Sequence, residues 1–183
     1  SKLDFLKNDT AWQTDEKIMP YYIDKRDIEE IRKNIEELKP LDESVMVTNA
    51  ITALFEQLVE LNESRKTAKK EKIHLKSDIP GIADSEVIKE KAGSIVADKY
   101  PSAKIKKVNV TKEWEYKQTE DWEDTSRTKW IVKQVYESVA QAAVILDGNI
   151  CKLLTLHIEK PKEGVTLSGH IMYEDDMLEK NIV

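Results

Sequence analysis

The fold class is clearest from Lys129–Tyr173, which has the sequence KWIVKQVYESVAQAAVILDGNICKLLTLHIEKPKEGVTLSGHIMY. A long apolar segment, Trp130–Leu146, ends at Asp147-Gly148, a dipeptide that favours a tight hairpin turn because such turns need positive φ. Ile150, Leu154, Leu156 and Ile158 then share one parity, which is typical of a strand with one buried face. Pro161 and Gly164 predict another turn, and Val165–Tyr173 alternates again. The pattern predicts an antiparallel meander.

The register of the first hairpin has two solutions. A two-residue loop pairs Ile145 with Ile150, whereas a three-residue loop that includes Asn149 pairs Leu146 with Ile150. A slip of one residue moves every side chain to the other face of the sheet. The facing of Cys151 therefore stays open.

The residues before this stretch predict helices. A stripe of isoleucines and leucines at three- and four-residue spacing predicts a helix over Asp24–Leu38, with Asp24 as N-cap and Pro40 as its stop. Asp42 is the predicted cap of a second, longer helix that reaches about Lys72 and forms a hairpin with the first. Past Leu61 its apolar pattern fails. A basic cluster follows there, and the expectation is that it complements the helix dipole rather than binds an acidic partner: Arg65, Lys66, Lys69, Lys70, Lys72 and Lys76.

The remaining segments complete the prediction. Asp84 caps a third helix that Pro101 ends, and Lys104–Gln118 forms the first strand, with a bulge near Lys106-Lys107. We expect an acidic loop at 119–126, and an arm at 1–22 that packs its apolar side chains on the body. The tail after Tyr173 is expected to fray; in the alternative it docks through Met177, Leu178, Ile182 and Val183.

The sequence thus predicts an α+β protein with two parts. An N-terminal arm and helical hairpin occupy residues 1–76, and residues 83–183 form a domain in which one helix packs on a roughly four-stranded, curved antiparallel sheet. The segment 77–83, which contains Pro80-Gly81, is the predicted linker.

Composition narrows the classes of partner. The chain has 183 residues, 35% of them charged, and a net charge of −6, which argues against nucleic acid as the main partner. No apolar run is long enough to predict a membrane span. The single cysteine excludes an internal disulfide, and the start at Ser1 without a hydrophobic leader fits a processed N-terminus.

Several short motifs resemble a group of small secreted proteins of gut bacteria, many of them lipoproteins of unknown function. They are Tyr100-Pro101-Ser102-Ala103-Lys104-Ile105, then Trp114, Arg127 and Asp147-Gly148-Asn149-Ile150-Cys151. The resemblance covers about residues 84–173 and implies a cystatin-like or NTF2-like fold and a secreted or periplasmic location. It implies no activity and brings no catalytic residues. The chain departs from the group in lacking a lipidation cysteine near Ser1.

The sequence contains few residues in patterns that would support catalysis or the binding of a cofactor or metal. No glycine-rich phosphate loop and no metal-ligand spacing occurs, so the sequence predicts no cofactor, no metal and no catalytic residue. His157 and His170 are expected near each other across the last hairpin, where a pair could bind metal or titrate together, although two surface or half-buried histidines are the default. Cys151 is expected to be a packing residue.

Aromatic residues supply the remaining candidates. Trp114, Tyr116, Trp130 and Tyr136 share one parity within each strand and could line the concave face of the sheet as a ligand-binding surface, together with His157. An aromatic core beneath the helix is the simpler interpretation. Trp122 in the acidic loop is a candidate partner-binding residue, and folding back onto apolar surface is its alternative.

Three functions follow. The first is a non-catalytic binding or protein-interaction module, expected to be exported, that uses the concave sheet or the Trp122 loop. The second is a small-molecule isomerase or dehydratase of the NTF2-like type, with His157 or a tyrosine as acid or base. The third is an assembly subunit, possible as a homo-oligomer, that pairs through the helical hairpin. A filled sheet face favours the module over the enzyme, and an exposed apolar stripe on the hairpin favours assembly.

Overall fold

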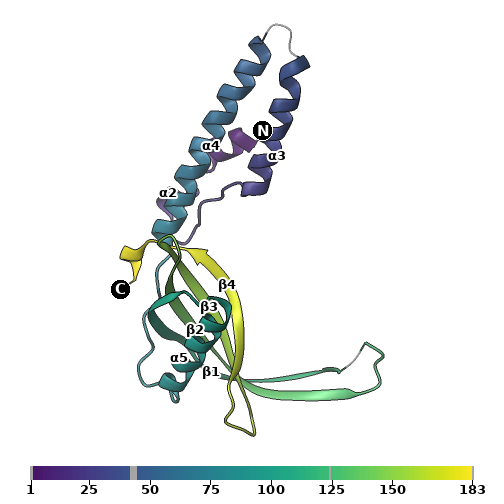
Figure 1. The fold of residues 1–183 in the computed structure, drawn as a ribbon. Helices are drawn as coiled ribbons and strands as arrows, with labels where there is room; N and C mark the ends of the chain where they lie inside the picture. The colour runs from purple at the N-terminus through teal and green to yellow at the C-terminus, as the bar shows by residue number, and fades with distance from the viewer. Residues whose placement is uncertain (1, 42–44, 124, 183) are drawn as a thin grey trace. The chain divides into compact units, whose positions relative to one another are not determined.

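A computed structural model describes residues 2–41, 45–123 and 125–182, which form two compact units, Ser1–Lys72 and Ile73–Val183. The fold is α+β: helices make up the first unit, and the second contains one α-helix and a four-stranded antiparallel sheet that does not close (Figure 1). The predicted fold class is confirmed.

The first unit is a helical hairpin with an N-terminal arm. The arm carries two short helices, α1 (Lys2–Asn8) and α2 (Ala11–Thr14). Helix α3 (Lys25–Leu38) and the 3₁₀ turn η1 (Lys39–Leu41) lead to α4 (Met46–Lys72). The Asp24 carboxylate accepts a hydrogen bond from the Asp27 amide at 3.0 Å, which confirms the predicted N-cap. Asp42, the predicted cap of α4, lies outside the described residues.

The second unit begins with the connection 73–84 and helix α5 (Ser85–Lys99). Strands β1 (Lys104–Trp122), β2 (Trp130–Leu146), β3 (Ile150–Pro161) and β4 (Ser168–Asp176) follow in a meander of order β1-β2-β3-β4 that curves around α5 (Figure 1). Asp84 precedes α5 at φ 61° and makes no side-chain cap, contrary to the prediction, because its carboxylate pairs with Lys160 at 2.8 Å.

Both faces of the sheet carry an apolar cluster. Under α5 the sheet face packs into an apolar core, in which ten residues of the helix and strands are fully buried: Ile88, Ala92, Val96, Val110, Ala140, Ala142, Val144, Leu154, Leu156 and Ile158. On the opposite face, the end near the β2–β3 turn packs Leu153 and Cys151 against Ile73, Leu75 and Met177. Asn181 holds this cover in place by donating to the Ile73 carbonyl at 2.9 Å.

The register resolves the first hairpin. Leu146 pairs with Ile150, so the loop has three residues, and both Gly148 (φ 78°) and Asn149 (φ 60°) take left-handed backbone conformations. The predicted bulge is confirmed by a register shift between Ile105 and Lys107.

Two boundaries were predicted wrongly. Strand β1 continues through the supposed acidic loop to Trp122, because Thr119–Trp122 pair with Trp130–Lys133 of β2. Strand β4 begins at Ser168 and continues through the acidic run to Asp176, so the tail does not fray after Tyr173. Met177 is buried and Ile182 packs beside it, as the docking alternative predicted.

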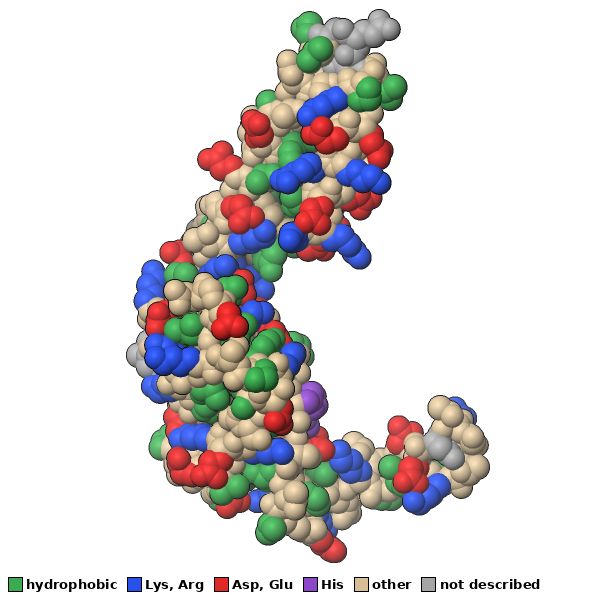
Figure 2. All heavy atoms as spheres, viewed as in Figure 1, with side chains coloured by type: hydrophobic (Ala, Val, Ile, Leu, Met, Phe, Trp, Pro, Cys, Tyr) green, Lys and Arg blue, Asp and Glu red, His purple; other side chains and the backbone are tan. Residues whose placement is uncertain are grey.

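Charge is spread over the surface. Figure 2 shows acidic and basic side chains interspersed on the face that it presents, rather than gathered by sign. None of the described helices has an apolar stretch that could cross a membrane.

Candidate functional site

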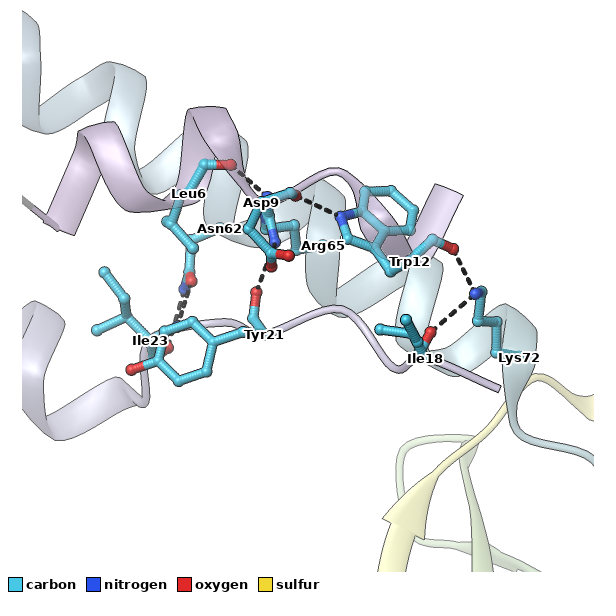
Figure 3. A network of polar contacts seen from close by, with 9 residues as sticks. All are labelled: Leu6, Asp9, Trp12, Ile18, Tyr21, Ile23, Asn62, Arg65 and Lys72. Atoms are coloured by element: carbon cyan, nitrogen blue, oxygen red, sulfur yellow. Dashed lines mark hydrogen bonds and ion pairs between the residues drawn. The ribbon is translucent and has the colours of Figure 1, made fainter. Parts of the chain in front are cut away.

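A buried polar network attaches the arm to α4 (Figure 3). The Arg65 side chain is 2% exposed; its guanidinium donates to the Asp9 carboxylate at 2.7 Å, to the Tyr21 carbonyl at 3.2 Å, and to the carbonyls of Leu6 and Asp9. It also lies over the Trp12 ring, 5.6 Å from the centroid. Carbonyl groups at the end of α1 have no partners within the helix, so a buried guanidinium satisfies them.

Two more residues of α4 bind the arm in the same way. The Asn62 amide accepts from the Ile23 amide at 2.6 Å and donates to the Ile23 carbonyl at 3.0 Å. The Lys72 ammonium donates to the carbonyls of Asp15 and Ile18, at 2.8 and 2.9 Å, and to that of Trp12. The polar face past Leu61, which interrupts the apolar pattern in the sequence, is therefore the docking face for the arm.

The arm covers only part of the apolar stripe on the hairpin. Leu6, Ile23 and Leu58 form the buried cluster, with Leu3 and Phe55 beside them. Beyond this cluster a groove of about 350 Å³ remains open. It is lined mainly by apolar side chains: Leu3, Ile31, Ile35, Leu38, Ile51, Leu54, Phe55 and Leu58, with Lys2 and Asn34.

Several apolar side chains of the hairpin are exposed. Leu54 is 51% exposed and Leu38 is 44% exposed. Leu41, Val45, Met46 and Val47 are exposed as well. A second groove on the hairpin has apolar side chains, Ile35, Phe55 and Val59, and also polar and charged ones: Arg32, Glu36, Thr52, Glu56 and Glu60. The hairpin therefore presents an open apolar groove, which we call the hairpin groove.

The predicted aromatic residues lie on the β1–β2 ribbon in two groups. The Tyr116 and Tyr136 rings meet edge to face at 5.6 Å, and the Lys160 ammonium lies over Trp114, 4.6 Å from the ring centroid. Lys162 lies over Tyr116 at 5.7 Å. Lysine side chains of the protein itself thus lie over the rings of this inner group, which shares the sheet face of α5, and Tyr116 stays 42% exposed.

Trp130 lies apart from that group. It meets Trp122 edge to face at 5.1 Å, and the two indoles are 51% and 40% exposed. Figure 1 shows β1 and β2 continuing as a two-stranded ribbon past the end of β3. Trp122 and Trp130 are directly opposite each other as the last residue pair of these two strands. Among the described residues, no cation lies over either ring. A shallow hollow beside them is lined by Asp121, Trp122, Glu123, Thr125 and Arg127.

His157 lies on the opposite face of the sheet from these aromatic residues, because it alternates with the buried Leu156 and Ile158 of the α5 face. It pairs directly with His170 of β4, and the two imidazole centroids are 5.3 Å apart. The predicted cross-strand approach of these histidines is confirmed. The His157 Nε2 atom lies 3.6 Å from a Glu137 oxygen.

Several residues of these sites were missed in the sequence. Glu137 and Glu159 lie opposite each other on β2 and β3, and Glu159 is bonded by Lys133 at 2.8 and 2.9 Å, which lowers the pKa of the Glu159 carboxyl. Their parity, combined with the correct register, is the signal that places them beside His157. No sequence signal separates Arg65, Asn62 and Lys72 from the other polar residues of α4.

Cys151 is buried in the second apolar cluster, and burial raises the pKa of its thiol. A buried, protonated thiol is a poor nucleophile, so the position suits packing.

Comparison with protein-family models, with curated proteins and with solved structures finds no match.

Proposed function

We propose that this chain is a non-catalytic protein-interaction module that assembles with a second copy of itself through the hairpin groove. The observation that carries the proposal is the open apolar groove itself, because exposed apolar surface rimmed by polar residues is typical of sites where proteins bind one another. The packed sheet face under α5 supports a module over an enzyme of the NTF2-like type. The sheet curved around one helix supports the cystatin-like or NTF2-like kinship.

The expected occupant is another helical hairpin. Two antiparallel helices with one open apolar side complete a four-helix bundle when a second pair packs against them. The same hairpin meets that requirement, since Leu38, Ile51 and Leu54 supply an apolar stripe on both of its helices. A two-fold interface of this kind is self-complementary, which is the commonest way in which soluble proteins form oligomers.

Sedimentation velocity with matched variants tests the proposal. Leu54→Glu places a carboxylate in the groove and should weaken self-association at least about 100-fold, because an interfacial charge would be buried without a partner. Ala53→Glu introduces the same side chain at the neighbouring, exposed position of α4. Ala53 lines neither the hairpin groove nor the second groove, so this substitution should have little effect on self-association. Equal sedimentation of the two variants and the wild type would contradict the proposal.

A second contact surface is favoured by the exposed tryptophan pair on the ribbon. Aromatic residues concentrate binding energy at interfaces, and the segment 119–126 is acidic. We propose that Trp122 and Trp130 receive an extended basic segment of another protein, whose lysines or arginines would stack on the indoles. In a peptide-display selection, basic peptides should bind the wild type and lose affinity about tenfold or more for Trp130→Ser. Tyr173→Ser, which removes another exposed aromatic residue, is the control.

A further inference from the structure

The uncovered end of the sheet face opposite α5 carries a cluster of metal-ligating side chains. One ligand atom from each of Glu137, His157 and Glu159 can be chosen so that all three lie within 4.8 Å of one another. All three side chains are half-buried, on the adjacent strands β2 and β3. Regular antiparallel pairing, and not a mobile loop, fixes the backbone positions of the set.

The geometry points to a binding site for a zinc-like divalent cation formed by His157, Glu137 and Glu159, with His170 as the fourth ligand. Imidazole and carboxylate groups are ordinary ligands of such ions. Ligand atoms around a tetrahedral ion bound at about 2.1 Å lie about 3.4 Å apart. The separation of 3.6 Å between His157 Nε2 and Glu137 Oε2 already matches that spacing.

Two further features fit the same cation. His170 faces His157 directly across the β3–β4 ladder, at 5.3 Å between centroids, so a side-chain rotation brings a second imidazole to the ion. The Glu159 carboxylate already holds a cation, because the Lys133 ammonium bonds both of its oxygens. Lys133 is half exposed, so it can leave for solvent when a metal ion enters.

Other polar and charged groups lie near the Glu137 and Glu159 carboxylates, and a metal ion would compete with them for these ligands. The Ser168 hydroxyl donates to Glu159 at 3.2 Å. Lys117 pairs with Glu115 at 2.6 Å, which raises the pKa of the Lys117 ammonium, and the nearby Glu137 carboxylate raises it further. Lys133 is the direct competitor among them. Its removal should therefore strengthen metal binding.

Calorimetric titration of the full chain with zinc chloride, after dialysis against a chelator, tests this site. Saturable binding of one ion per chain is expected. His157→Ala, Glu137→Gln, Glu159→Gln and His170→Ala should each weaken it about tenfold or more. Lys133→Met should tighten it about tenfold. His74→Ala is the matched control, since His74 is exposed on the connection before α5 and is expected to leave the affinity unchanged.

Cobalt substitution gives a readout that does not depend on affinity. Four-coordinate cobalt with two imidazoles should show visible absorption that is lost in His157→Ala and kept in His74→Ala. Circular dichroism of each variant without metal should match that of the wild type. The inference is overturned if zinc does not bind at about 100 μM, or if His157→Ala and His74→Ala bind it equally well.

Discussion

In the first unit a polar network lies inside, whereas in the second unit apolar clusters lie on both faces of a sheet. Arg65, Asn62 and Lys72 bond main-chain atoms of an arm whose short helices and coil leave many carbonyl groups without partners. Strand pairing satisfies the regular backbone of the sheet, and apolar side chains such as Leu154 and Leu156 fill its α5 face. The buried polar side chains of its strands bond irregular backbone instead: Asn109 and Gln141 bond Lys76 in the connection before α5, and Ser138 bonds the Lys112 carbonyl at a bulge of β1. Irregular backbone therefore requires polar side chains to hold it, and regular backbone does not.

The largest effect should come from breaking the polar network at its centre. Arg65→Met leaves the Asp9 carboxylate and three carbonyl groups without their buried donor, and should lower the free energy of unfolding of the first unit by about 3 to 5 kcal/mol. Hydrogen exchange of the α1 and α4 amides measures this. Lys33→Met, which removes an exposed cation paired with Glu37, should cost less than about 0.5 kcal/mol. If the Arg65 variant exchanged like the wild type, the network would not hold the arm.

The next effect concerns the close packing of the sheet. A Cβ atom at Gly169 would lie 2.3 Å from the His157 carbonyl oxygen and 3.1 Å from Ile95 of α5. Gly169→Ala should therefore destabilise the second unit by about 2 to 3 kcal/mol, because strand β3 must move. Gly93→Ala, where the nearest atom is 3.9 Å away, should instead stabilise α5 by about 0.5 to 1 kcal/mol. Urea unfolding of both variants gives the comparison, and effects of the same sign would contradict it.

A smaller effect should depend on pH. Hydrogen bonds from Lys99 and Tyr100 lower the pKa of Glu174 from 4.5 to about 2. Because the folded pKa lies below the unfolded value, the carboxylate stabilises the fold above about pH 4.5, and this contribution disappears as the pH falls toward 2. Glu174→Gln should remove about 1 to 2 kcal/mol at neutral pH and flatten this part of the profile, after allowance for screening at the half-exposed Lys99. An unchanged acid profile in chemical unfolding would show that the carboxylate is not linked to stability.

The smallest effect on stability is expected for substitutions in the β1–β2 ribbon, which lies outside the buried clusters of both units. Trp122→Ser should change the free energy of unfolding by less than about 0.5 kcal/mol, since the side chain is exposed. It should nevertheless abolish the near-ultraviolet dichroism of the paired indoles. A large loss of stability would mean that the ribbon belongs to the core of the second unit.

Much of the sheet was predictable, because period-two alternation and the Asp147-Gly148 turn are local signals. The same signals allowed two registers at that turn, and only the positive φ of Asn149 selects the three-residue loop. Strand β1 was predicted four residues too short because Glu120 and Asp121 resemble loop residues. In the structure both belong to the strand, since they pair with β2. Tertiary pairing there overrides local propensity.

The candidate sites were predicted unevenly for a similar reason. His157 and His170 were placed together because one hairpin joins them. Glu137 belongs to the preceding strand, and the unresolved register of the β2–β3 hairpin hid its approach to His157. The basic residues at the end of α4 were expected to complement the helix dipole, since nothing local distinguishes Lys72, which bonds three carbonyl groups of the arm, from its neighbours.

Light scattering coupled to size exclusion measures whether two chains associate through the hairpin groove. The wild type at about 50 μM should have a mass of about 42 kDa, twice the 21.1 kDa of one chain, and Leu54→Glu should have the mass of one chain. A wild-type mass of one chain across the whole concentration range would rule out self-association through the groove.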